Sequence, residues 1–153
     1  IYRPHPLDLT IKGNQKLVKK IVAEFKNHKS FEIDQSVSYL ESFRKAEYLI
    51  TDITSTAYTF AFATQKPIIF YSNNEKNMKN DEYFKIYYFK DRKKIGYISK
   101  NLQDVSKDIN KIISKKNNFK NNIISLRKKR IKYFRSSLSK TQKILIKILN
   151  NMN

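Results

Sequence analysis

Two short polar clusters carry side chains suited to binding an anion. The first is Arg3-Pro4-His5-Pro6, close to the start of the chain. Arginine offers a planar fork of donors that matches phosphate oxygens. Histidine can donate a hydrogen bond to a phosphate, or move a proton near neutral pH. The two prolines stiffen the turn and fix the direction of His5. The alternative is that Arg3 pairs with Asp8 and that His5 is only a turn residue.

The second cluster is Thr54-Ser55-Thr56, which we expect at the start of a helix. A helix N-terminus has backbone N–H groups without partners and a partial positive charge. Hydroxyl side chains add donors there, and phosphate or pyrophosphate is the natural guest. The alternative is simple N-capping. Asp52 is predicted to support this cluster by orienting a hydroxyl or capping the turn. With no second carboxylate evident beside it, we predict no metal site and expect no cofactor.

Amphipathic helices and short apolar strands alternate along the chain. We expect helices near 14–28, 37–44, 54–64 and 102–113. We expect strands at 1–3, 31–34, 48–52, 67–71 and 95–98. The aromatic stretch at 82–89 suits a helix or a strand, and 119–152 should form one helix or two, with a break near 136–139. This βαβ pattern predicts an α/β fold: a Rossmann-like parallel sheet with helices on both faces, followed by a helical extension. Ligands of such sheets bind outside the carboxyl ends of the strands. The two clusters should therefore share one crevice.

Composition excludes several classes of site. The 153 residues suit one domain or a piece of a larger protein, and they include no cysteine and only two histidines. A disulfide framework, a thiolate zinc site, a cysteine nucleophile and a histidine-rich metal site are therefore excluded. The apolar runs are too short to span a bilayer. Because the chain opens without Met in what reads as the end of a strand, we expect it to be the C-terminal portion of a larger protein.

The positive charge is large and unevenly placed. Lys and Arg total 32 against 13 Asp and Glu, a formal net charge of +19. Frequent Lys, Asn and Ile suggest that an AT-rich genome explains part of this excess. However, residues 109–153 contain no acidic residue. This segment suits an anionic membrane surface or a nucleic acid, and the alternative is a solvated lysine-rich helical face.

Three segments in this order resemble the CDP-glycerol glycerophosphotransferase family, the teichoic-acid and capsule polymerases and their relatives. They are Arg3-Pro4-His5-Pro6, the run AEYLITDITSTAY at 46–58, and Lys66-Pro67-Ile68-Ile69-Phe70-Tyr71. The resemblance covers residues 1–72 closely. It continues loosely to the end of the chain, where residues 130–149 resemble the closing helices of that family.

The resemblance implies a transferase of the GT-B type. Residues 1–116 would be its C-terminal, Rossmann-like, donor-binding half, and the basic helices of 117–153 would pack on it or on a missing N-terminal half. The family moves an alditol phosphate from a CDP-linked donor to a membrane-linked or polysaccharide acceptor in cell-surface polymer synthesis, without a protein-bound metal. The resemblance assigns the donor phosphates to Arg3, His5, Thr54, Ser55 and Thr56, with His5 also the catalytic residue. It implies a cytoplasmic protein, peripheral on the inner face of the membrane through 109–153, and no nucleic-acid partner.

Two alternatives stay open. Many relatives carry an acidic residue in the helix where this chain has a neutral residue near Thr59. The donor is therefore CDP-glycerol, CDP-ribitol or a nucleotide sugar, and the last would make the chain a GT-B glycosyltransferase. The second alternative is a non-catalytic basic module that binds a membrane surface or nucleic acid through 109–153.

Overall fold

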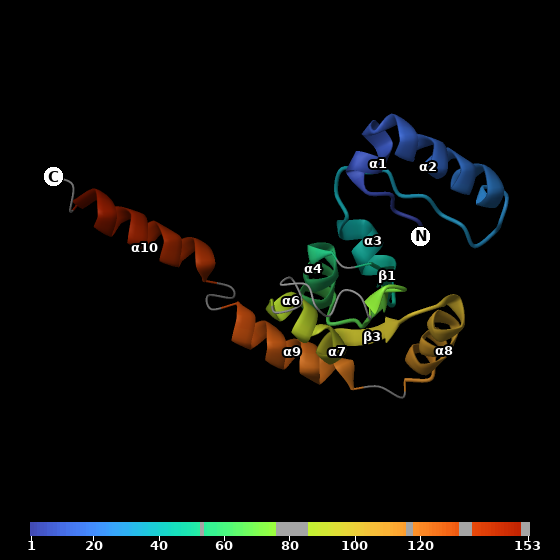
Figure 1. The fold of residues 1–153 in the computed structure, drawn as a ribbon. Coiled ribbons are helices and arrows are strands. Elements are labelled where there is room, and N and C mark those ends of the chain that lie inside the picture. Colours follow the sequence, from blue (N-terminus) through green and yellow to red (C-terminus); the bar gives the residue numbers. More distant parts are fainter. Residues whose placement is uncertain (53, 76–85, 116–117, 132–135, 151–153) are drawn as a thin grey trace. The chain divides into compact units, whose positions relative to one another are not determined.

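The chain adopts an α/β fold with two compact units (Figure 1). The computed structural model describes residues 1–52, 54–75, 86–115, 118–131 and 136–150, with the side chains of 137 and 148–150 excluded. The first unit is Ile1–Glu47 and the second is Tyr48–Asn153. The predicted division at residue 116 does not coincide with this boundary. Each unit is described by itself.

The first unit is helical. It contains α1 (Pro6–Thr10), α2 (Lys12–Phe25) and α3 (Leu40–Lys45), and α1 packs against α2. The apolar stripe of α2 predicted this helix, and its Val18 is buried. The sequence predicted a turn rather than a helix at α1. Pro6 favours the helix because its fixed φ suits a first helical position, where a missing N–H group costs nothing.

The two strands expected in this unit reduce to one isolated parallel bridge between Tyr2 and Ile33. The Tyr2 N–H donates to the Glu32 carbonyl over 2.7 Å, and the Asp34 N–H donates to the Tyr2 carbonyl over 2.9 Å. The prediction of strands at 1–3 and 31–34 is therefore wrong. The bridge nevertheless brings the residues that follow Tyr2 beside Asp34.

The second unit is built on a three-stranded parallel sheet with strand order β1-β2-β3. Its strands are β1 (Leu49–Thr51), β2 (Ile68–Tyr71) and β3 (Gly96–Ser99), which confirms the strands predicted at 48–52, 67–71 and 95–98. Parallel neighbours require crossover connections. Helix α4 (Ser55–Thr64) lies in the connection from β1 to β2, and α6 (Tyr87–Lys90) and α7 (Arg92–Ile95) precede β3.

Helices cover both faces of this sheet. On one face, α8 (Leu102–Ile113) places the Lys111 ammonium 4.9 Å from the Tyr97 ring centre. Its buried Asp108 also accepts a hydrogen bond of 2.9 Å from Ser99 Oγ. Neighbouring strand residues point to opposite faces. Ile98 lies between Tyr97 and Ser99 and therefore points to the other face. Phe70, its partner on β2, points the same way and lines a cavity together with Ser55 and Tyr58 of α4. This covering is compatible with a Rossmann-like arrangement.

Helix α9 (Phe119–Arg130) packs against α7 and α4 inside the second unit. Its Arg127 donates a 2.6 Å hydrogen bond to the Phe62 carbonyl near the end of α4, where a cation suits the helix dipole. Helix α10 (Ser137–Asn150) is separate from α9 in the described part of 119–152. The break predicted near 136–139 is misplaced, because 137–139 already belong to α10. No helix among the described residues has the length and apolar character needed to cross a membrane.

Close strand packing explains the glycine at the start of β3. A Cβ atom at Gly96 would lie 1.9 Å from the backbone oxygen of Ile68 on the neighbouring strand. That oxygen cannot move away without disrupting the ladder between β2 and β3.

We expect Gly96→Ala to lower the free energy of unfolding by roughly 2–4 kcal/mol, because the added methyl group overpacks a buried backbone contact. Thermal unfolding followed by circular dichroism measures this loss. The control is Gly13→Ala in α2, where nothing lies within 4 Å of the added atom. That variant should be unchanged or stabilised by about 0.5–1 kcal/mol. Equal midpoints for the two variants would contradict the packing argument.

Candidate functional site

The start of α4 lies after the carboxyl end of β1, as the sequence predicted. Thr54 is the N-cap in an extended conformation, and its hydroxyl accepts a 3.3 Å hydrogen bond from the Thr56 N–H. Capping by Thr54 is therefore confirmed. Ser55 and Thr56 are exposed in the first turn, and Asp52 is also exposed. The Thr56 N–H is bound by this cap, and the Ala57 N–H donates to the Thr54 carbonyl over 3.3 Å. The first turn therefore offers an anion the Ser55 N–H, the exposed hydroxyls of Ser55 and Thr56, and the helix dipole.

A cavity of about 230 Å³ opens beside this turn. We call it the aromatic cavity, and its lining residues are Thr54, Ser55, Tyr58, Phe70, Ile86, Tyr88, Phe89 and Arg92. A second cavity, of about 430 Å³, shares Ser55, Tyr58 and Tyr88 and continues to Thr59 and Arg130. The start of α4 thus borders two hollows with aromatic walls.

Tyr58 anchors the aromatic wall. Its hydroxyl donates a hydrogen bond to the Tyr88 carbonyl, and the two rings meet edge to face with centres 4.6 Å apart. Burial raises the pKa of Tyr58, and the negative charge of Asp91 raises it further. The hydroxyl therefore stays neutral and keeps its donor role over the physiological range. The spacing of Tyr58 in the sequence is typical of a core residue and gives no sign of a place in a cavity wall.

Two adjacent, oppositely charged residues are buried at this edge of the sheet. Arg92, only 2% exposed, donates to the two Glu75 carboxylate oxygens over 2.7 and 3.3 Å. Its guanidinium also lies 5.2 Å from the Phe89 ring centre. Asp91 accepts hydrogen bonds from Lys94, at 2.7 Å, and from Arg130.

The buried Asp91 remains a carboxylate. Burial alone would raise its pKa, but hydrogen bonds from Lys94 and Arg130 outweigh that effect and leave the pKa lowered. The sequence gives no signal for this pair or for the Glu75–Arg92–Asp91–Arg130 arrangement. In a chain with 32 basic residues, no local pattern distinguishes a buried Arg from a solvated one.

In the first unit, Arg3 binds a carboxylate of its own chain. One guanidinium nitrogen lies 2.5 Å from Asp34 Oδ2, and the other donates to the Ser36 carbonyl over 2.8 Å. The alternative pairing with Asp8 is wrong, because the bridge between Tyr2 and Ile33 brings Asp34 to Arg3 instead. The Arg3 guanidinium, which the family resemblance assigns to donor phosphates, is therefore already hydrogen-bonded to Asp34 and Ser36.

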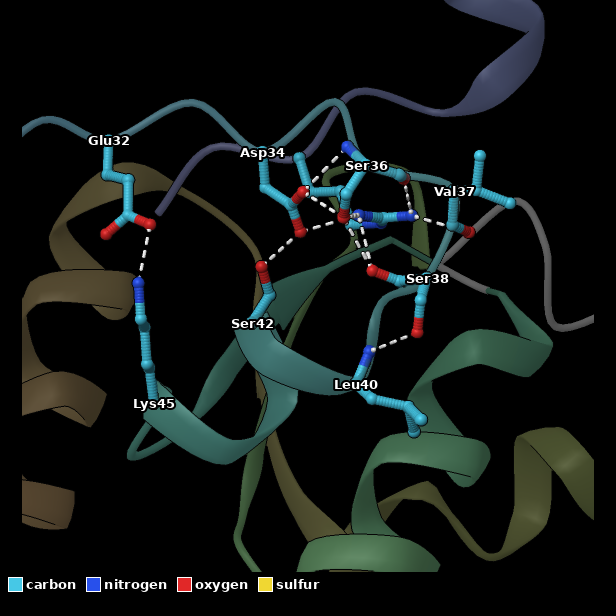
Figure 2. Close-up of polar contacts among 9 residues, drawn as sticks. Glu32, Asp34, Ser36, Val37, Ser38, Leu40, Ser42 and Lys45 are labelled. Atoms are coloured by element: carbon cyan, nitrogen blue, oxygen red, sulfur yellow. Dashed lines mark hydrogen bonds and ion pairs between the residues drawn. The ribbon is translucent and has the colours of Figure 1, made fainter.

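Asp34 is the centre of this polar cluster (Figure 2). Its carboxylate accepts hydrogen bonds from the Ser36 hydroxyl (2.6 Å), the Ser36 N–H (2.9 Å) and the Ser42 hydroxyl, in addition to Arg3. Hydrogen bonds from Ser36 and Ser42, and then the one from Arg3, lower the pKa of Asp34. A separate ion pair of 2.8 Å joins Glu32 to Lys45. Together these contacts tie α3 to the segment before it.

His5 caps α1 and exposes its ring. Nδ1 accepts a 3.2 Å hydrogen bond from the Leu7 N–H, so in the neutral ring the proton must sit on Nε2. Nε2 is then a hydrogen-bond donor and not a proton acceptor. In this arrangement His5 can donate to an anion, whereas acting as a base at Nε2 would require the other tautomer and the loss of the cap.

The candidate residues fall in different units. Arg3 and His5 belong to the first unit, and Asp52, Thr54, Ser55 and Thr56 belong to the second. The shared crevice therefore stays a prediction. Across the described ranges, no group of three or more His, Cys, Asp and Glu residues could hold a metal ion. Comparison with protein-family models, with curated proteins and with solved structures finds no match to this chain.

The Asp34 cluster makes stability depend on pH. A lowered folded-state pKa contributes stability that is present above the unfolded value of about 3.9 and is lost as the pH falls below it. We expect Asp34→Asn to lower the thermal midpoint at pH 6, and the difference from the wild type to shrink at pH 3. Thermal unfolding at the two pH values measures both effects.

The matched control is Glu41→Gln. Glu41 pairs with Arg44 at 3.2 Å, but both side chains are more than 70% exposed, so removing this charge should change little. A wild-type midpoint for Asp34→Asn at pH 6, or a difference that stays constant down to pH 3, would contradict the role given to Asp34.

Proposed function

We propose that this chain is the donor-binding half of a GT-B-type transferase. It moves glycerol phosphate, or a related alditol phosphate, from a CDP-linked donor to a membrane-linked or polysaccharide acceptor in cell-surface polymer synthesis. The observation that supports this best is the exposed first turn of α4, at the carboxyl end of β1, with the aromatic cavity beside Thr54 and Ser55. In parallel α/β sheets, this edge is where ligands bind.

In the proposed reaction, the oxygen of an acceptor hydroxyl forms a bond to the phosphorus that carries the alditol, and the hydroxyl proton passes to solvent. The bond from that phosphorus to the oxygen of the cytidine monophosphate leaving group breaks. Negative charge grows on the leaving group, so preorganised donors around it lower the barrier. The Ser55 N–H and the hydroxyls of Ser55 and Thr56 would supply such donors, and Asp52 would support the turn.

His5 enters this proposal as the donor of one hydrogen bond. Its Nε2 carries the proton in the capped arrangement, which is the form that can donate a hydrogen bond to a phosphate. Arg3 contributes through position. Its pairing with Asp34 fixes the segment before His5, and reaching a phosphate directly would require breaking that pair. The loss of either residue would weaken the donor complex by different routes.

The proposed membrane partner meets the protein at α10. Leu138, Ile144 and Leu145 are exposed on this helix, while its cations Lys140, Lys143 and Lys147 recur at spacings of three and four residues. A helix with an apolar face and a cationic face suits an anionic lipid surface. Ile148 and Leu149, which could have packed onto a missing half, lie outside the described side chains.

The nucleotide-sugar glycosyltransferase remains the second candidate. The observation in its favour is Thr59, a neutral residue that lines the cavity next to Ser55 where many members of the resembling family carry an acid. Without a carboxylate at that place, preference between cytidine and uridine compounds rests on other contacts. A nucleotide titration therefore has to compare cytidine compounds with uridine compounds.

Ser55→Ala should weaken CDP binding about ten- to a hundredfold, since a hydrogen bond to a charged oxygen contributes about 1.5–3 kcal/mol. His5→Asn, which keeps a side-chain acceptor for the cap, should weaken CDP binding to a similar degree. Calorimetric titration with CDP, CDP-glycerol, UDP and UDP-sugars measures these affinities. Ser106→Ala, at an exposed position of α8, is the control and should bind as the wild type does.

A preference for UDP compounds would move the proposal to the glycosyltransferase. Saturable binding of oligonucleotides that falls steeply with salt, without binding of any nucleotide diphosphate, would favour the basic module.

Leu145→Glu should reduce binding to vesicles containing phosphatidylglycerol at least about tenfold, because it places a charge on the apolar face of α10. Co-sedimentation with vesicles of phosphatidylglycerol and phosphatidylcholine, against phosphatidylcholine alone, measures the effect. Leu102→Glu is the matched control, because Leu102 is 75% exposed at the start of α8. Equal binding by both variants, or no preference for the anionic vesicles, would contradict the assignment to α10.

A further inference from the structure

A third cavity, of about 580 Å³, lies at the carboxyl ends of β2 and β3. Ile98 and Lys100 line it at the end of β3, Glu75 lines it after β2, and Lys90 and Lys93 line it from α6 and α7. We call it the basic cavity. None of the residues that the sequence assigned to donor phosphates lines it. Arg92 lines both the basic cavity and the aromatic cavity.

The charges around the basic cavity are unbalanced. Its carboxylate, Glu75, is already bound by Arg92 and by the Ser72 hydroxyl, the latter at 2.7 Å. The ammonium groups of Lys90, Lys93 and Lys100 have no hydrogen-bond or ion-pair partner in the described part of the chain. By contrast, the neighbouring Lys94 pairs with the buried Asp91 at 2.7 Å, and Lys111 pairs with Asp108 at the same distance.

Three unpaired cations around one hollow repel one another, and the hollow concentrates their field. The buried Arg92–Glu75 pair, held by Phe89 and Phe70, makes a fixed wall that does not neutralise them. An anion with about three negative charges would balance the lysines, and two linked phosphoryl groups carry about that charge near neutral pH.

We infer that the basic cavity binds a diphosphate group through Lys90, Lys93 and Lys100, with the Arg92–Glu75 pair as its rigid wall. The group is either free pyrophosphate or the diphosphate of a nucleotide. This inference does not depend on the transferase proposal, because Lys90, Lys93 and Lys100 line neither the aromatic cavity nor the start of α4. The two proposals can fail separately.

The test is calorimetric titration of the full chain with pyrophosphate at 50 and 200 mM NaCl. The wild type should bind pyrophosphate saturably, and more tightly at the lower salt. The triple variant Lys90→Gln/Lys93→Gln/Lys100→Gln should bind at least about tenfold more weakly. The control, Lys107→Gln/Lys120→Gln/Lys128→Gln, removes equal charge from exposed positions outside the described cavities and should change the affinity less than about twofold.

Absence of saturation in the wild type, or equal weakening in both triple variants, would overturn the inference. So would an equal loss of pyrophosphate affinity in Ser55→Ala, because the anion would then lie at α4.

A competition experiment with CDP identifies the source of the diphosphate group. Displacement of pyrophosphate by CDP, with CDP also weakened in the cavity variant, supports a nucleotide diphosphate. Binding of CDP without displacement supports free pyrophosphate.

Discussion

The carboxyl edge of the parallel sheet depends on one buried pair of adjacent charges, Asp91 and Arg92. Each is 2% exposed, and each reaches a different segment: Arg92 binds Glu75 after β2, and Asp91 binds Arg130 of α9. Buried charges are tolerated only when they are paired, and removing one partner of such a pair costs about 3–5 kcal/mol. This pair of adjacent, opposite charges therefore ties the turn between α6 and α7 to the segment after β2 and to α9. The walls of the aromatic and basic cavities follow from that constraint, since Arg92 lines both.

The structure distributes its positive charge unequally. Arg3 is bound by Asp34, Lys94 by Asp91 and Lys111 by Asp108, so these cations act within the fold. Lys90, Lys93 and Lys100 line the basic cavity, and Lys140, Lys143 and Lys147 lie along α10. Some cations are therefore neutralised by acids of the fold. The excess of cations that makes the net charge +19 is what bears on partners. Every acidic residue of the chain precedes Ile109, and two of the cations that follow it, Lys111 and Arg130, pair with the acids Asp108 and Asp91.

Periodicity and apolar runs predicted most of the second unit. The strands around Leu49, Ile68 and Gly96 read as short apolar segments because parallel strands are buried on both faces, and α4 and α8 follow from their caps and stripes. In the first unit, a local pattern could not show that Tyr2 and Ile33 form a single bridge, since strand formation depends on distant pairing. The helix start expected at 54–56 is confirmed, with Thr54 as its N-cap. No local pattern could show the partner of Arg3, because Asp34 lies 31 residues away. Burial of Arg92 has no local signature.

The central claim is that the first turn of α4 binds the phosphates of a cytidine nucleotide. The most direct measurement is a titration of the ¹⁵N-labelled chain with CDP, followed by amide chemical shifts. The account predicts saturable shifts of the Ser55, Thr56 and Ala57 amides, whose N–H groups lie in the first turn of α4. It also predicts that the amides of α8, on the opposite face of the sheet, stay unchanged. Unchanged amides at Ser55–Ala57 under saturating CDP, or shifts confined to another part of the chain, would contradict the account.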